Sequence, residues 1–316
     1  MSTPSFGDAG ERETALESTP LPHLGVLQFA GPGAIDFLQG QVSNDTRRLA
    51  AGAPLLAAYS NAQGRVIAVL HLLPHSSGVL AVLPRDVLAA TAERLRKFVL
   101  RAKVKIEDST QRFAVIGVVH AAALAALGLQ APDERGYLER DGIGVARLGP
   151  AAPDRHASTR FWVIREAQPR LEPADPRIER AWRLADIRAG LPTVYAATSE
   201  AFVAQMLNLD LLDGISFSKG CYTGQEIIAR TQNLGRIKRR MFRLRLPAGD
   251  WSIGQPLRLA DGRGGRIIEL ASVGEGFEAL AVLTLEARGA DAEGASEGAT
   301  ANAVVAAELP LPYRTE

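Results

Sequence analysis

The segment from Asp213 to Arg230 carries the residues best suited to chemistry, including Cys221, the single cysteine of the 316-residue chain. Three glycines interrupt the segment: Gly214, Gly220 and Gly224. Good helix formers follow them, so a glycine-rich turn that leads into a helix is expected. The first N–H groups of such a helix would point at an anion or carbonyl, and Lys219 would add positive charge. Because this setting favours a thiolate, Cys221 and Lys219 are the candidate catalytic residues.

Simpler interpretations of the same segment stay open. A lone cysteine is often a small buried hydrophobe, and a glycine-rich turn is often only a turn. The chain contains neither Gly-x-x-x-x-Gly-Lys-Ser/Thr nor Gly-x-Gly-x-x-Gly, so a nucleotide-binding loop of either kind is excluded. His71 and His75 have the spacing of a helical metal pair, but Pro74 and the strand-like context argue against one.

A basic run follows, because residues 227–249 contain seven basic side chains and no acidic one. They are Arg230, Arg236, Lys238, Arg239, Arg240, Arg243 and Arg245. Such a run can hold a polyanion, for example RNA phosphate or a polyglutamyl tail. Basic residues on strand edges are also commonly solvated, and only Phe242 and Trp251 supply aromatic rings nearby. Direct RNA contact is therefore an alternative rather than the main prediction.

Length and composition limit the classes of protein. The length predicts about two domains, and 47% hydrophobic with 22% charged residues is typical of a globular protein. A net charge of +1 indicates neither a nucleic acid nor a membrane as partner. One cysteine excludes an internal disulfide and a cysteine-only metal site within one chain. With no signal-like N-terminus and no run of ~18 apolar residues, the cytoplasm is the expected location.

The elements that must position these residues follow an α+β pattern. Apolar runs predict strands at 24–30, 55–60, 66–73, 79–83, 104–107 and 113–119. Helical spacing predicts helices after Gly33, over 85–100 and over 177–188. Between two strands, Asn61–Gly64 suits a hairpin turn with positive φ. Because these elements do not alternate as repeated βαβ units, antiparallel sheets are favoured.

The two ends of the chain differ from its middle. Residues 1–20 are expected to form a disordered, acidic tail. From Met241 onward, short apolar runs separated by Gly, Pro and Asp are typical of a small all-β module. Residues 287–303 are rich in Ala and Gly and are expected to be a flexible loop within this module.

The run Lys219-Gly-Cys-Tyr-Thr-Gly-Gln-Glu226, with Ala229-Arg230, resembles the signature of YgfZ-type folate-binding proteins. These are relatives of the glycine-cleavage T-protein, an aminomethyltransferase. The resemblance extends to Phe37–Asp45, Asn61–Gly64, Arg188–Pro192, Phe202–Phe217 and the terminal Leu-Pro-Tyr313. It therefore covers nearly everything except the first twenty residues and the loop at 287–303.

The resemblance implies a T-protein-like ring around a central hole that can admit a folate. Residues 21–240 would form two ferredoxin-like α+β subdomains, and residues 241–316 an antiparallel β-barrel. Cys221 and Lys219 would lie at the mouth of the hole. The residues implied to bind tetrahydrofolate or a related folate are Gly220, Tyr222, Gly224, Gln225, Glu226, Arg230, Arg188 and Asn44. Family members support the assembly or repair of iron–sulfur enzymes, including radical enzymes that modify tRNA.

Two departures from the T-protein pattern bear on activity. The T-protein carries an Asp pair in the strand after the Gly64-equivalent turn, whereas Arg65–His71 contains no carboxylate. It also carries a Glu that can accept two hydrogen bonds from the pterin ring, at the position held here by Arg188. Arginine only donates, so Arg188 cannot make that pairing.

The main prediction is therefore a folate-binding accessory factor for iron–sulfur enzymes rather than a classical aminomethyltransferase. One alternative is a tetrahydrofolate-dependent one-carbon transferase, and another is a non-enzymatic scaffold that presents the basic surface. The expected partners are a folate-like small molecule and iron–sulfur client enzymes, without a membrane and without a resident metal.

Overall fold

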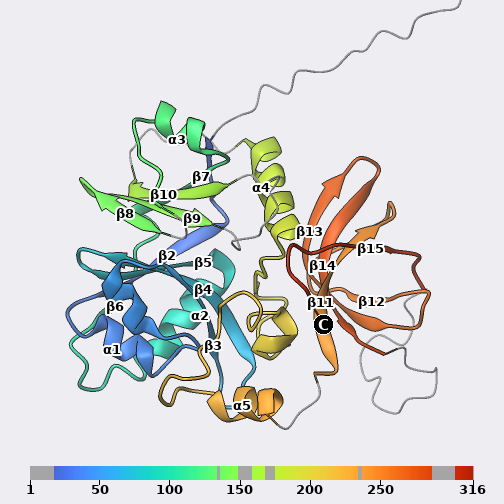
Figure 1. The fold of residues 1–316 in the computed structure, drawn as a ribbon, viewed down its shortest axis with the longest axis horizontal. Helices are drawn as coiled ribbons and strands as arrows, with labels where there is room; N and C mark the ends of the chain where they lie inside the picture. The colour runs from blue at the N-terminus through green and yellow to red at the C-terminus, as the bar shows by residue number, and fades with distance from the viewer. Residues whose placement is uncertain are drawn as a thin grey trace, which may run out of the picture.

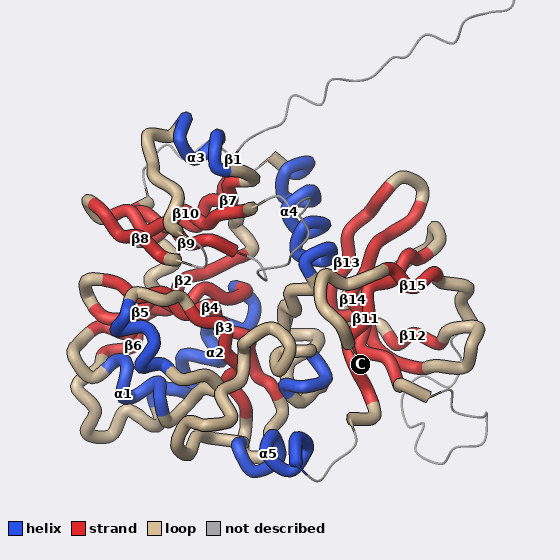
Figure 2. Tube along the Cα trace, in the orientation of Figure 1, coloured by secondary structure: helices blue, strands red, loops and turns tan. Residues whose placement is uncertain are grey.

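The computed structural model describes residues 18–133, 136–148, 159–167, 175–233, 237–286 and 303–315. Its strands form three antiparallel sheets of five strands each. The first two sheets lie one above the other, and the third lies beside them with helix α4 (Pro176–Ala189) between (Figures 1 and 2). Among the described residues, no helix has the length and hydropathy needed to cross a membrane.

The first sheet is buried on both faces. Its order is β3-β4-β5-β2-β6, with β2 at Leu24–Ala30, β3 at Leu55–Ser60, β4 at Val66–His75, β5 at Gly78–Pro84 and β6 at Lys105–Asp108. Helices α1 (Ala34–Gln39) and α2 (Arg85–Arg96) and the 3-10 helix η1 (Thr46–Ala51) cover one face. The other face packs on the second sheet through Leu73, Leu80 and Val82. Two covered faces explain why β3, β4 and β5 are mostly continuous apolar runs instead of alternating ones.

The second sheet shares that core and carries α4. Its order is β1-β7-β10-β9-β8, with β1 at Ser18–Pro20, β7 at Phe113–Val118, β8 at Tyr137–Arg140, β9 at Ile143–Leu148 and β10 at Arg160–Glu166; α3 is Ala121–Ala126. Asp175 caps the start of α4 by accepting from Arg177 N, and Gly190 ends the helix at φ 64°. Trp182 of α4 lies so close to Gly117 that a Cβ there would meet its ring at 2.6 Å.

The third sheet forms the C-terminal module. Its order is β12-β13-β14-β11-β15, with β11 at Arg239–Leu246, β12 at Pro256–Arg258, β13 at Gly264–Val273, β14 at Gly276–Thr284 and β15 at Ala307–Leu309. A bridge between Leu259 and Val304 also joins the chain after β12 to the chain before β15. Between α4 and β11, the chain forms the 3-10 helix η2 (Ala204–Leu207) and α5 (Gln225–Asn233).

The connecting segment joins the first sheet to the third. Phe202, Leu207, Tyr222 and Ile228 share one core with residues of β4, β11, β13 and β14. The segment Lys219–Arg230, which contains the signature, is therefore part of the packing between the first and the third sheet.

The predicted strands and helices occur within a few residues of their predicted bounds, and the α+β class is confirmed. Helix α2 ends at Arg96 rather than at residue 100. The predicted tail is wrong for residues 18–20, which pair with β7 as β1. Residues 1–17 of that tail, and residues 287–302 of the predicted loop, lie outside the described residues.

Candidate functional site

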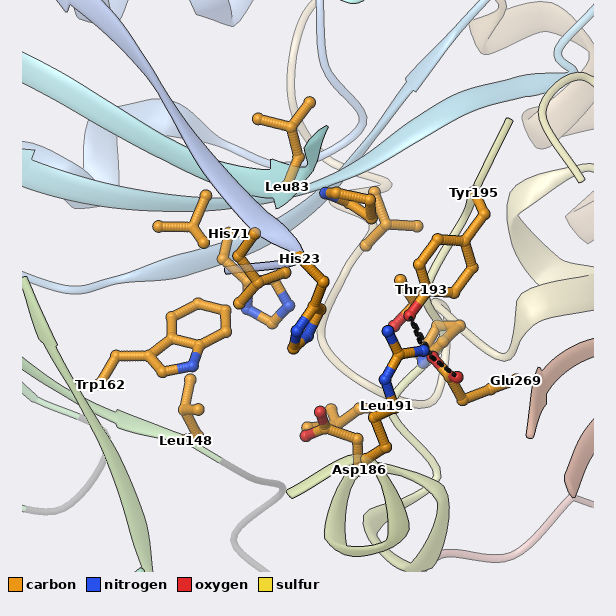
Figure 3. A pocket seen from close by; sticks show the side chains of 16 residues that line it. His23, His71, Leu83, Leu148, Trp162, Asp186, Leu191, Thr193, Tyr195 and Glu269 are labelled. Atoms are coloured by element: carbon orange, nitrogen blue, oxygen red, sulfur yellow. Dashed lines mark hydrogen bonds and ion pairs between the residues drawn. The ribbon is translucent and has the colours of Figure 1, made fainter. Parts of the chain in front are cut away.

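A small cavity, partly open to solvent, lies where the three sheets meet (Figure 3). The first sheet contributes Val69 and His71 of β4 and Val82–Pro84 of β5, and the second contributes Leu148 and Trp162. Arg183 and Asp186 come from α4, Tyr195 from the following loop and Glu269 from β13. The walls combine nine apolar residues with seven polar ones, so the cavity offers both packing surface and hydrogen-bonding groups.

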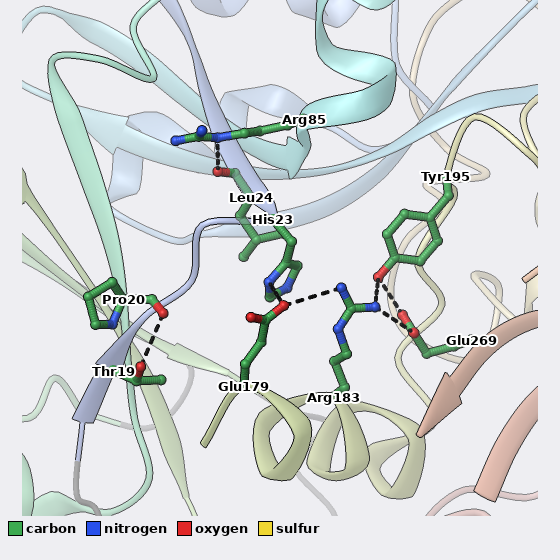
Figure 4. Close-up of polar contacts among 9 residues, drawn as sticks. All are labelled: Thr19, Pro20, His23, Leu24, Arg85, Glu179, Arg183, Tyr195 and Glu269. Carbon is green, nitrogen blue, oxygen red and sulfur yellow. Dashed lines mark hydrogen bonds and ion pairs between the residues drawn. The ribbon is translucent and has the colours of Figure 1, made fainter. Parts of the chain in front are cut away.

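One end of the cavity holds a hydrogen-bonded carboxylate (Figure 4). The Tyr195 hydroxyl donates to Glu269 Oε2 at 2.8 Å, and Arg183 Nη1 lies 3.5 Å from Glu269 Oε1. Burial raises the pKa of Glu269 to about 7, against the opposing charge of Arg183. This carboxyl group can therefore hold or release a proton near neutral pH.

Two histidines on the opposite walls are neutral at pH 7. Burial lowers the pKa of His71 to about 4, and its ring meets Trp162 edge-on at 4.7 Å between centroids. Burial also lowers the pKa of His23 to about 4, although its Nδ1 lies 3.1 Å from Glu179 Oε1. Each imidazole can thus donate one hydrogen bond and accept another.

Asp186 presents a second carboxylate to the cavity. Its Oδ1 accepts from Arg160 Nη1 at 2.7 Å, and its side chain is 19% exposed. Arg160 is itself buried and stacks over the Trp182 ring at 4.7 Å, so it holds the carboxylate in place. Burial raises the pKa of Asp186, and the charge of Arg160 opposes that shift.

The signature segment lies outside this cavity and is bonded to the first sheet's helical layer. Lys219 is 7% exposed, and its Nζ donates to the carbonyls of Gln39, Val42 and Asn44 at 2.7, 2.7 and 2.9 Å. Its ammonium also lies over the Tyr222 ring at 4.8 Å. Since an ammonium has three donors, this lysine has no hydrogen bond left to give a ligand, and its predicted role at an anion site depends on its charge alone.

Asn44 fixes the same junction from the other side. Its Nδ2 donates to the carbonyls of Leu56 and Asp213 at 2.9 and 2.6 Å, and its Oδ1 accepts from Asp45 N. The neighbouring Ser43 hydroxyl donates to Gly214 O at 2.6 Å. The buried Asn44 side chain therefore links strand β3 of the first sheet to the chain at Asp213 by hydrogen bonds.

Gly224 and Gly64 bring two sequence motifs into contact. Both have positive φ, 82° and 69°, and a Cβ on Gly224 would lie 2.7 Å from Asn61 O. A Cβ on Gly64 would lie 2.8 Å from Cβ of Ile227 in α5. The turn before α5 thus packs on the β3–β4 hairpin at a distance that only glycine permits.

No protein-family model matches the chain. The tRNA-modifying protein YgfZ of Serratia proteamaculans is 33% identical over 233 residues, which cover 71% of this chain and 69% of that protein. That of Pectobacterium atrosepticum is 31% identical over 224 residues, 68% of this chain and 66% of the relative. The chain belongs to the YgfZ family. The matched region spans 66% to 69% of these two relatives' own length.

The fold is that of the T-protein. The glycine cleavage system aminomethyltransferase T from Bartonella henselae matches with a TM-score of 0.61 at 15% identity, over 85% of this chain and 78% of that one. The predicted T-protein-like architecture is therefore confirmed. In this member of the YgfZ family, the carboxylate-free strand β4 lines the central cavity with Val69 and His71.

Arg188 does not face the cavity of this YgfZ-family chain. Its Nη2 donates to Glu278 Oε1 at 2.9 Å, and Arg243 Nη2 donates to the other oxygen of that carboxylate at 2.7 Å. The anion that Arg188 meets is thus a glutamate of β14, and the contact ties α4 to the third sheet.

Some residues of the basic run form ion pairs with acidic residues from other parts of the chain. Arg240 is buried and makes two 2.9 Å hydrogen bonds to the Asp210 carboxylate, and Arg243 is paired with Glu278. Arg230 and Lys238 are exposed, whereas Arg236 lies outside the described residues. Arg240 and Arg243 are therefore already paired, so the alternative of a scaffold with a basic surface depends on fewer side chains than the run contains.

The remaining signature residues lie next to Cys221 in the sequence or on α5, which follows it. Cys221 is exposed, which contradicts its interpretation as a buried packing residue. Helix α5 begins four positions later at Gln225, whose Oε1 accepts from Tyr222 N at 3.3 Å. Glu226 and Arg230 are exposed on α5, Tyr222 is buried, and Gly220 has open space beside it.

The cavity-lining residues were missed by sequence reasoning. Within the described part of the chain, the lining includes none of the ten residues predicted for catalysis or folate binding. A signal existed for α4, whose Arg183 and Asp186 lie one turn apart on a helix that was predicted.

Proposed function

We propose that this chain is a folate-binding accessory factor in tRNA modification, which supports the assembly or repair of iron–sulfur enzymes. The names of its YgfZ relatives and the T-protein fold support this function. The observation that carries the folate part is the cavity at the junction of the three sheets, with the buried carboxylate of Glu269, the partly buried carboxylate of Asp186 and an aromatic wall.

The side chains around this pocket carry polar groups that a pterin ring can pair with. Asp186 and Glu269 can accept from the N–H groups of a pterin ring, and Trp162 and His71 offer flat apolar surface. A reduced folate supplies a carrier for a one-carbon unit.

Aminomethyl transfer is not the activity that we propose. Strand β4 faces the cavity with Val69 and with His71, whose pKa of about 4 leaves it uncharged. An uncharged wall cannot stabilise a developing iminium or ammonium as a carboxylate would. The exposed thiol of Cys221 is instead assigned to contact with client enzymes, and Lys219 to positioning the loop that carries it.

The test is calorimetric titration of the full chain with tetrahydrofolate under anaerobic conditions. We expect saturable binding by the wild type and by Cys221→Ala, because the thiol does not line the cavity. The same variant should fail to support a methylthiolating tRNA enzyme in cells. No heat at millimolar tetrahydrofolate would overturn folate binding, and full support by Cys221→Ala would remove the role assigned to the thiol.

A further inference from the structure

The chain between α2 and β6, residues 96–105, places cations and apolar side chains on the same surface. This 96–105 segment contains five basic residues and no acidic one. The five basic side chains are all exposed: Arg96, Lys97, Arg101, Lys103 and Lys105. Between them, Phe98 is 48% exposed and Leu100 is 91% exposed. Apolar surface flanked by cations favours a partner that is both negatively charged and partly apolar.

The backbone of the segment is fixed against the first sheet. Val99 and Val104 pack on the core that this sheet shares with its helices. Lys103 O accepts from Gly33 N at 3.1 Å, and a Cβ on Gly31 would lie 2.5 Å from the same oxygen. The basic and apolar side chains are therefore presented by a packed loop whose backbone is already in place for a partner.

Acidic side chains of this chain neutralise the segment only in part. Two ion pairs involve it: Lys97 with Glu93 at 3.7 Å and Lys105 with Glu107 at 2.8 Å. All four of these side chains are at least 43% exposed, and ion pairs at such positions are weak. Within the described ranges, no acidic side chain pairs with Arg101 or Lys103. Most of the positive charge is therefore available to a partner.

The composition of the segment fits a nucleic-acid strand better than a protein or a membrane. Lysine is depleted at protein interfaces, whereas three of these five cations are lysines. Phe98 and Leu100 together expose less apolar surface than one myristoyl chain, which by itself binds a bilayer only marginally. An unpaired base offers a flat face to an aromatic ring, and its phosphates attract Lys and Arg.

We propose that the 96–105 segment binds unpaired nucleotides of an RNA, with a base stacked on Phe98 and phosphates held by Arg101 and Lys103. Leu100 extends the apolar surface beside the ring. The choice of RNA rests on the proposed function in tRNA modification, whereas the surface itself does not depend on folate.

The proposed RNA surface is separate from the cavity. Strand β6, which follows the segment, is the edge of the first sheet that lies away from the third sheet (Figure 1). None of the residues 96–105 lines the cavity. RNA can therefore be bound while the cavity remains open, and the two activities can be tested one at a time.

The role of the cations is tested by fluorescence anisotropy with a labelled single-stranded RNA of mixed sequence, in the absence of folate. We expect the full chain to bind it with a Kd of about 1–100 µM at about 50 mM salt. Arg101→Gln/Lys103→Gln should bind at least about tenfold more weakly. It should also flatten the slope of log K against log salt by about 1.4, because each single-strand phosphate contact contributes about 0.7.

The control for charge is Lys238→Gln/Arg258→Gln, which removes two exposed cations at the third sheet instead. It should bind the RNA as the wild type does. An equal loss of affinity in the two double variants would overturn the proposal, because binding would then follow the net charge and not the segment. All four substituted side chains are exposed, and equal melting temperatures check that folding is retained.

The stacking on Phe98 is tested with the same RNA strand, free and annealed to its complement. Phe98→Ala should bind the single strand about tenfold more weakly but the duplex as tightly as the wild type, since paired bases expose no face to the ring. The control Leu127→Ala shortens a side chain that is also 48% exposed, next to α3, and should bind both as the wild type does. Equal binding of the single strand by Phe98→Ala and the wild type would overturn the stacking.

Other partners of the segment give different results. No binding of the RNA strand at about 100 µM protein and about 50 mM salt would overturn the proposal. Sedimentation of the wild type with vesicles of phosphatidylcholine and phosphatidylserine, lost in Phe98→Ala/Leu100→Ala and without RNA binding, would assign the segment to a membrane surface instead. Neither outcome affects the folate part of the proposed function, which the tetrahydrofolate titration tests separately.

Discussion

His71 and Glu269 line the same cavity but change the stability of the fold with pH in opposite directions. The pKa of His71 falls to about 4 on folding, whereas that of Glu269 rises to about 7, and burial is the first cause of both shifts. Between pH 4 and 6.5 the unfolded chain holds a proton on this histidine that the folded chain lacks. Protonation of His71 therefore destabilises the folded state as the pH falls from 6.5 to 4. Protonation of Glu269 has the opposite effect and stabilises the folded state as the pH falls from 7 to 4.5.

We predict that His71→Gln flattens the loss of stability on acidification. Lowering the pH from 7 to 5 should cost the wild type about 2 kcal/mol at this residue, and the variant should not lose it. Urea unfolding at the two pH values measures the difference. The comparison uses the change with pH, so a general destabilisation by the substitution does not affect it.

Glu269→Gln is the matched variant, because it removes the group that opposes His71. Its loss of stability from pH 7 to 5 should be steeper than that of the wild type by about 2 kcal/mol. If the free energy of unfolding changed equally with pH in the wild type and in both variants, the pKa shifts of His71 and Glu269 would be contradicted.

The sequence indicated which residues of the signature are candidates for function, but not which residues they would form hydrogen bonds with. Lys219 next to Cys221 has the pattern of an anion site, yet its protons go to carbonyls about 180 positions earlier in the chain. Arg188 donates, as every arginine does, but its partner Glu278 is 90 positions away. Such pairs depend on long-range packing, which the spacing of residues does not encode.

At the scale of elements, the turn before α5 and the β3–β4 hairpin pack through two glycines. Gly224 has a φ of 82°, and a Cβ there would meet the carbonyl oxygen of Asn61 at 2.7 Å. Gly52, at the end of η1, has a similar φ of 79°, but a Cβ there would meet nothing within 4 Å. Alanine substitutions at Gly52 and Gly224 therefore distinguish two contributions to the loss of stability. Gly52 reports the strain of a side chain at positive φ alone, and Gly224 adds the clash with a neighbouring backbone.

We predict that Gly52→Ala lowers the free energy of unfolding by about 1 kcal/mol, since it only adds a Cβ at positive φ. Gly224→Ala should cost about 2–4 kcal/mol, because the hairpin or α5 must also move. Urea unfolding of both variants measures this. Equal losses would show that the two turns do not pack as closely as described.

Strands β4 and β5 of the first sheet could be predicted because they are mostly continuous apolar runs, covered on both faces. The hairpin β8–β9 was not predicted, since its strands are short and partly exposed. Its Asp141-Gly142 turn, with φ of 52° and 75°, carries the sequence signal that could have found it.

At the scale of the whole molecule, the cavity joins residues from position 23 to position 269. No local pattern contains this set, because the set exists only once three sheets have been placed around α4 (Figure 1). The signature is local in sequence and was therefore visible, but the part of it that the structure describes serves the packing between the first and third sheets.

Hydrogen exchange distinguishes the two places where a folate could bind. A ligand in the cavity contacts all three sheets, so tetrahydrofolate should slow exchange together in β4, β10 and β13. Saturation at about 100 times the dissociation constant adds about 2.7 kcal/mol to the folded state, and the segments that line the site should share that protection. Mass spectrometry of peptic peptides measures it, with peptides from β8 as the internal control, since no residue of that strand lines the cavity. Protection confined to residues 219–226 would instead place the ligand at the signature and remove the cavity from the mechanism, because those residues bond to the first sheet without reaching the junction of all three.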